Sequence, residues 1–144
     1  WAEVALAELE LAREANPGEE VIVIGHSLGA VTWLKLIEQG LITSPVSRAL
    51  LVAPADSDLL LDIADFVVDP STVSVSAGAA STVIVGSDDD EWSPRGVEVT
   101  FAEPLGIPSV IIPGAGHLAF QDGFGQWAGV INWVNDPTSD LTVR

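Results

Sequence analysis

The spacing of apolar and polar residues predicts helices and strands that alternate along the chain. In residues 1–15, apolar side chains recur at a helical interval with acidic side chains between them, which is typical of an amphipathic helix. Val21–Ile24 is instead a continuous run of branched apolar residues, which indicates a strand buried on both faces. A second helix is expected from Leu28 to about Gln39, where Gly40 ends it.

The same alternation continues to the end of the chain. The pattern predicts three further strands, at Arg48–Ala53, Ser81–Val85 and Ile107–Ile112. It predicts further helices at Asp58–Val67, from about Pro94, and at Gln126–Asn135. Strands separated by helices form right-handed crossovers, and these place the strands parallel in one sheet. The predicted fold class is therefore α/β, a parallel sheet flanked by helices in a single domain over residues 1–144.

Composition and charge exclude several classes of partner. No apolar run approaches the roughly 18–20 residues that cross a bilayer, and the net charge is −16. Such a charge repels phosphate backbones and anionic lipid surfaces, so we expect no nucleic-acid partner and no membrane partner. Residues 1–10 are acidic and do not resemble a signal peptide, which favours a cytoplasmic location. The oligomeric state is left open.

The residue types also limit metal chemistry. The chain has no cysteine and only two histidines, His26 and His117, so it lacks the nitrogen and sulfur ligands of a conventional transition-metal site. We therefore expect no metal and no cofactor. Carboxylate sites for Ca²⁺ or Mg²⁺ stay open on composition, and a cation-binding module built on Asp88, Asp89 and Asp90 is one alternative function.

One motif carries chemistry. The strand predicted at Val21–Ile24 is followed directly by Gly25-His26-Ser27-Leu28-Gly29, which opens the second helix. A G-x-S-x-G motif between a strand and a helix turns the chain sharply and exposes the serine oxygen above the sheet edge. The backbone N–H of Leu28 is then expected to donate to an oxyanion. The competing interpretation is a serine that only caps the helix.

A serine hydroxyl needs a base that removes its proton, and the chain offers two histidines. His26 adjoins Ser27 and is expected to point away from it, in a packing role with a hydrogen bond to a neighbouring loop. His117 lies in a glycine-rich loop after the last predicted strand, where a catalytic histidine follows the serine and the acid in chain order. The acid is expected in the turn after Ser81–Val85, and spacing alone leaves Asp88, Asp89 and Asp90 in contention.

Four aromatic side chains lie near these motifs in the sequence. Trp92 is on the turn that carries the candidate acids (residues 86–94, the acid loop), and Phe120 is on the loop that carries His117 (residues 113–120, the histidine loop). We therefore predict that these two contact the substrate. Trp33 and Trp127 fall within predicted helices, where core packing is the better interpretation.

Together these motifs resemble the small serine-hydrolase family that includes retinoblastoma-binding protein 9 and the bacterial YdeN-like proteins. The matching stretches are Val21–Ala30, Val85–Asp90 with Pro94, Gly114–His117 and Gly123–Trp127. The resemblance implies an α/β-hydrolase-type sheet and a Ser-His-Asp mechanism. It also implies that the acid is Asp90, four residues before Pro94, with Asp89 second and Asp88 third.

Family members carry further strands and a glycine-rich loop upstream of the region that matches Trp1, and that loop supplies a second oxyanion donor. We therefore expect a hydrolase sheet that lacks its N-terminal strands and has an uncovered edge. Either the chain is an N-terminally truncated fragment, or its site keeps only one of two donors. Loss of one donor costs on the order of 10²–10³ in turnover.

The predicted function is hydrolysis of a small ester or amide, an acyl substrate, through an acyl-enzyme formed on Ser27. The alternative is a catalytically weak interaction protein that keeps the hydrolase scaffold.

Overall fold

The computed structural model describes all 144 residues and contains one sheet of four strands. The strands are β1 (Ile22–His26), β2 (Val46–Val52), β3 (Ala79–Ser87) and β4 (Ser109–Ile112). Their order in the sheet follows their order in the chain, and each neighbouring pair is parallel. All four strands therefore end at the same edge of the sheet, the edge at which parallel sheets build their sites.

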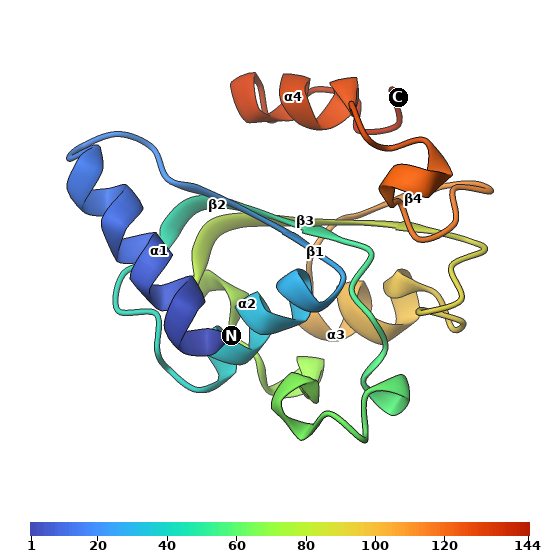
Figure 1. The fold of residues 1–144 in the computed structure, drawn as a ribbon, viewed down its shortest axis with the longest axis horizontal. Helices are drawn as coiled ribbons and strands as arrows, with labels where there is room; N and C mark the ends of the chain where they lie inside the picture. The colour runs from blue at the N-terminus through green and yellow to red at the C-terminus, as the bar shows by residue number, and fades with distance from the viewer.

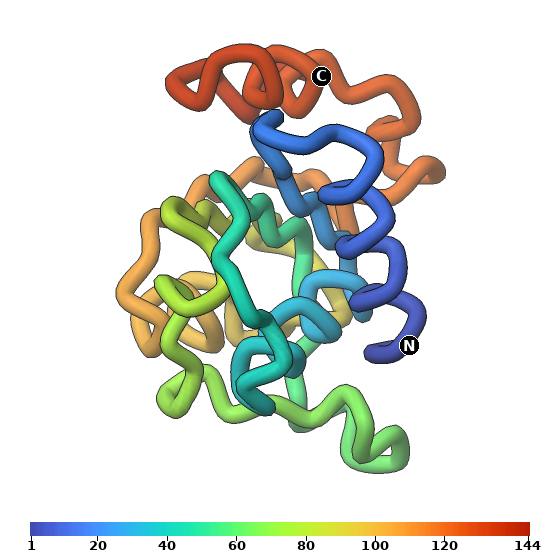
Figure 2. The backbone as a smooth tube through the Cα atoms, turned by 90° about the vertical axis from the view of Figure 1, so that its left-hand side faces the viewer, coloured from blue at the N-terminus to red at the C-terminus, as the bar shows by residue number.

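Helices cover both faces of this sheet. They are α1 (Ala2–Ala15), α2 (Leu28–Glu38), α3 (Glu103–Leu105) and α4 (Ala128–Asn135). Figure 1 shows α2 and α3 below the sheet and α4 above it, with α1 on the left beside α2. Figure 2 shows the same layers after a quarter turn. None of the helices has both the length and the apolar character that a membrane crossing requires.

Alternation along β2 divides the core between the two faces. Ala49 and Leu51 belong to the larger buried cluster with α2, whereas Leu50 and Val52 belong to the smaller cluster with Trp133 of α4. Successive strand residues point to opposite faces, so a central strand has to be apolar throughout. Burial of a leucine or valine side chain stabilises the fold by roughly 1.5–3 kcal/mol.

One buried cation fastens α4 to the sheet. The guanidinium of Arg48 in β2 donates to the carbonyls of Trp133 and Val134 at 2.7 and 2.9 Å. It also forms a two-pronged pair with Glu20 at 2.8 and 2.9 Å. The Glu20 carboxylate raises the pKa of Arg48 above its ordinary value, so the cation is secured beside the carbonyls that end α4.

The strand at Val21–Ile24 differs from its predicted environment. The sheet begins at β1, so this strand is paired on one side only, and the Ile24 side chain is 46% exposed. The prediction of burial on both faces is therefore wrong here. The expected uncovered sheet edge is the outer edge of β1.

Two predicted helices also take other forms. In place of a helix over Asp58–Val67 the chain makes short 3₁₀ turns, and the first begins where the Asp56 carboxylate accepts the backbone N–H of Asp58. Aspartate side chains compete with helical bonding in this way. The helix expected from Pro94 is delayed by Gly96, whose φ of +81° is left-handed, and its body over Glu98–Ala102 is π-helical.

Candidate active site

Ser27 stands on a strained turn between β1 and α2. Its φ is 54°, a left-handed conformation that is uncommon for a residue with a side chain and that often marks a functional site. Its N–H donates to the Val52 carbonyl at 2.8 Å, which fixes the turn against β2. A Cβ at Gly25 would lie 2.8 Å from the Ala30 nitrogen, so this glycine lets α2 start directly against β1. A Cβ at Gly29 would meet open space.

His117 reaches this serine from the loop after β4. Its Nε2 lies 2.8 Å from the Ser27 Oγ, within hydrogen-bond distance. The loop turns through two left-handed glycines, Gly114 and Gly116, with φ values of 61° and 58°, and then through Leu118 at 54°. These turns reverse the chain within five residues and bring the imidazole back over the end of β1.

Asp90 completes a hydrogen-bonded chain. It follows β3, its side chain is buried, and its two carboxylate oxygens lie 2.9 and 3.0 Å from Nδ1 of His117. One of these oxygens also accepts the backbone N–H of Trp92 at 2.9 Å. In such an arrangement the carboxylate orients the imidazole, and the opposite ring nitrogen is free to accept the serine proton.

The other two aspartates of the turn bond to the backbone of the histidine loop. Asp88 accepts the N–H of Gly114 at 2.8 Å, and Asp89 accepts that of Gly116 at 2.7 Å. The Ser87 hydroxyl and the Gly116 N–H hold the pKa of Asp89 below its ordinary value. No histidine, aspartate or glutamate side chains gather in a group of three or more that is suited to a metal ion.

The His26 side chain has a specific partner in the loop that carries His117. Its Nε2 lies 2.8 Å from the backbone carbonyl of His117, so a ring N–H at this position donates to that oxygen. The two imidazole rings are 4.9 Å apart between centroids. His26 is exposed at the surface rather than packed in the core, and its hydrogen bond supports the histidine loop there.

Sequence reasoning missed an ion pair that holds the acid loop. Asp56, after β2, is 1% exposed, and both of its oxygens accept from the Arg95 guanidinium at 2.8 and 2.9 Å. Its N–H donates to the Trp92 carbonyl at 2.8 Å. The loop that carries Asp90 is thereby fixed to β2 as well as to the histidine loop. The available signal was position, because Asp56 follows a predicted strand end.

The remaining predicted residues surround this chain. Leu28 opens α2, so its N–H is one of the groups that lack a helical acceptor. Trp92 is 44% exposed, with its ring 6.3 Å from that of His117 between centroids. Phe120 is 83% exposed and lines an open, mostly apolar cavity of about 520 Å³ that also borders His26.

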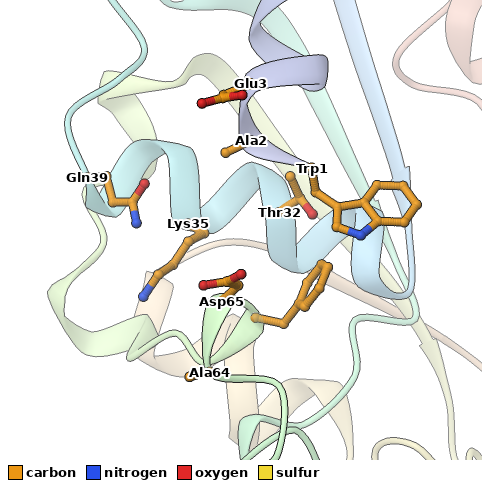
Figure 3. Close-up of a pocket in the computed structure, with 9 residues that line it drawn as sticks. Trp1, Ala2, Glu3, Thr32, Lys35, Gln39, Ala64 and Asp65 are labelled. Atoms are coloured by element: carbon orange, nitrogen blue, oxygen red, sulfur yellow. The ribbon is translucent and has the colours of Figure 1, made fainter.

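A second cavity, of about 280 Å³, lies toward the other end of α2 (Figure 3). It is bordered by the first turn of α1, by α2 and by the 3₁₀ turn at Ala64–Phe66. Its cation, Lys35, donates to the Val67 carbonyl at 2.7 Å and pairs with Glu38 at 2.7 Å. The charge of this lysine is therefore already paired.

Solved structures show the same fold. A protein of Pectobacterium atrosepticum designated a YdeN-like hydrolase is 26% identical with a TM-score of 0.67, over 94% of this chain and 68% of that chain. The monoacylglycerol lipase of Paleococcus ferrophilus is 15% identical with a TM-score of 0.58, over 93% of this chain and 73% of that one. At 15% identity the similarity to the lipase supports the fold alone. None of the curated proteins matches the sequence significantly.

The family profile described as serine hydrolase matches residues 3–136, which include every residue of the site above. The fold and the similarity to the YdeN-like hydrolase are consistent with this family profile. The chain belongs to the serine hydrolase family.

Proposed function

We propose that the protein hydrolyses small ester or amide substrates through an acyl-enzyme, with Ser27 as nucleophile, His117 as base and Asp90 as the acid that orients it. The observation that carries this proposal is the continuous hydrogen-bonded chain of the three side chains, 2.8 Å from Ser27 to His117 and 2.9 Å from His117 to Asp90. A serine that only capped α2 would have no reason to face an imidazole, and its side chain makes no cap bond.

The reaction follows from this geometry. The Ser27 oxygen attacks the substrate carbonyl while its proton passes to Nε2 of His117. The imidazolium that forms is stabilised by the buried Asp90 carboxylate beside Nδ1. It then protonates the leaving alcohol or amine, which departs and leaves an acyl group on Ser27. Water then attacks this ester with His117 again as base, which releases the acid product and regenerates the free serine.

The developing oxyanion is stabilised by the N–H of Leu28. This group lies directly after the nucleophile at the start of α2, where the helix dipole favours negative charge. Trp92 and Phe120 are proposed to contact the substrate, because their exposed rings lie on the two loops that also carry Asp90 and His117. Within the family we place the chain with retinoblastoma-binding protein 9 and the YdeN-like proteins, on the acidic turn and Gly-His loop that they share.

Hydrolysis of p-nitrophenyl acetate tests the proposal. We expect the parent protein to release p-nitrophenol with saturation. Ser27→Ala and His117→Ala should each lower kcat by about 10⁴-fold or more, since members of a triad act as a unit. Asp90→Asn should lower it by about 10⁴-fold, because the imidazole then adopts the wrong tautomer.

The matched control is Ser93→Ala. Ser93 is a buried serine on the acid loop whose hydroxyl has no hydrogen-bond partner, so its loss should leave kcat within about twofold. Activity that persists in folded Ser27→Ala protein would refute the proposal. A folded parent protein without activity would favour the alternative, an interaction protein that keeps the scaffold.

A further inference from the structure

Beyond the end of the sheet, side chains continue the pairing of β3 with β4. The last backbone pair of these strands is Ser87 with Ile112. After it, three successive backbone N–H groups of the histidine loop donate to three successive side chains of the acid loop. These bonds run from Gly114 to Asp88 at 2.8 Å, from Ala115 to Ser87 at 2.9 Å and from Gly116 to Asp89 at 2.7 Å. The next residue of each loop continues the series, since His117 faces Asp90.

The acceptors are linked to one another. Ser87 is 1% exposed. Its hydroxyl accepts the N–H of Ala115 and donates to the Asp89 carboxylate at 2.6 Å. One oxygen of Asp89 therefore receives both the Ser87 proton and the Gly116 N–H. Two charged acceptors and one hydroxyl thus hold three N–H groups of this loop, and the first and third of these belong to glycines with left-handed φ values.

We propose that Ser87, Asp88 and Asp89, the acceptor triplet, are positioning residues that fix the histidine loop so that His117 stays between Asp90 and Ser27. This inference rests on the proposed function, because it assigns the three residues to the same reaction. A misplacement of about 1 Å at a catalytic group costs on the order of 100-fold in rate. The loop needs such support, since Leu118 directly after the histidine has a left-handed φ of 54°.

Asp89 is thereby separated from the role of catalytic acid. Its bonded oxygen faces Ser87 and Gly116, whereas both oxygens of Asp90 face the imidazole. The same two donors lower the pKa of Asp89, which keeps it an ionised acceptor in the neutral range. The acid loop therefore holds one buried carboxylate that orients the imidazole and two exposed carboxylates that accept from the neighbouring loop.

Kinetics of Asp89 variants test the proposal. We expect Asp89→Ala to lower kcat for p-nitrophenyl acetate by roughly 10- to 100-fold with KM within about twofold, because the base is misplaced while the substrate surface is kept. Asp89→Asn should recover to within about threefold of the parent, since its amide oxygen still accepts from Gly116. Asp90→Asn should show no such recovery.

Asp140→Ala is the matched control. Asp140 is also exposed, also accepts a backbone N–H and a hydroxyl, here both from Thr142, and also has a lowered pKa, but it lies outside the site. It should leave kcat within about twofold. Full activity in Asp89→Ala would overturn the proposal, as would a loss in Asp89→Asn as large as that in Asp90→Asn.

Amide hydrogen exchange gives a second readout that needs no turnover. Exchange at the Gly116 amide should be at least about tenfold faster in Asp89→Ala, because the amide loses its acceptor. Exchange at the Gly114 amide should be faster by a similar factor in Asp88→Ala, for the same reason. Unchanged exchange at both amides would overturn the proposal even if the enzyme mechanism were sound. Persistent activity in Ser27→Ala would instead refute the proposed function, whatever the exchange shows.

Discussion

At the scale of single residues, the two glycines of the G-x-S-x-G motif are not equivalent. The missing Cβ of Gly25 makes room for the backbone of Gly29 and Ala30, whereas Gly29 itself faces open space. The motif therefore contains one glycine that packing requires and one that packing in this structure does not.

Alanine at each position tests this difference. Gly25→Ala should destabilise the protein by about 1–3 kcal/mol, because backbone atoms at 2.8 and 2.9 Å have to move. Gly29→Ala lies in the first turn of α2 and should be neutral or stabilising by up to about 1 kcal/mol. Urea unfolding of the two variants measures both values. Equal losses at the two positions would contradict the packing argument.

The anchoring carboxylate of Asp89 should also appear in the pH dependence of stability. Its pKa is lowered in the folded protein, so its contribution is complete above the ordinary aspartate value of about 3.9 and is lost as the pH falls below that value. The difference in unfolding free energy between the parent and Asp89→Ala should therefore be constant between pH 5 and 7 and shrink below about pH 4. A difference that grows on acidification would have the wrong sign.

At the scale of elements, sequence patterns located the strands better than the segments between them. Runs of branched apolar residues such as Leu50–Val52 and Val83–Val85 report burial directly, and the four strands lie within a few residues of their predicted places. The prediction of a helix over residues 58–67 is wrong because the start of this segment depends on Asp56, which is bonded to Arg95 far along the chain. No local pattern contains that contact.

The attachment of α4 gives a prediction at this scale. Arg48→Met should destabilise the protein by about 2–4 kcal/mol, because the charge-assisted bonds to Trp133 and Val134 are lost together. Glu20→Gln should cost clearly less than Arg48→Met, since the Glu20 side chain is 48% exposed and solvent screens its pair with Arg48. Thermal or urea unfolding separates the two. A larger loss of stability in Glu20→Gln than in Arg48→Met would show that Arg48 stabilises the fold through its pair with Glu20 rather than through the carbonyls of α4.

At the scale of the whole molecule, the sheet explains how distant segments form one site. Ser27, Asp90 and His117 follow β1, β3 and β4, and parallel strands bring these ends to one edge. The expectation of parallel strands, together with motifs placed directly after them, made this arrangement predictable. The structure also has the expected hydrogen bond from His26 to a neighbouring loop, at the His117 carbonyl. The bonds of the acceptor triplet depend on how the two loops face each other, which no local sequence pattern shows. A single domain, the cytoplasmic location and the absence of nucleic-acid and membrane partners stay predictions.

The most direct test of the account is the site of covalent modification by a fluorophosphonate, which reacts with activated serines. Mass spectrometry of the labelled, folded protein should find one adduct, on the peptide that contains Ser27. The adduct should be absent in Ser27→Ala and form far more slowly in His117→Ala, because His117 is the group that accepts the serine proton. Failure of the folded parent to react, or labelling that persists in Ser27→Ala, would contradict the account.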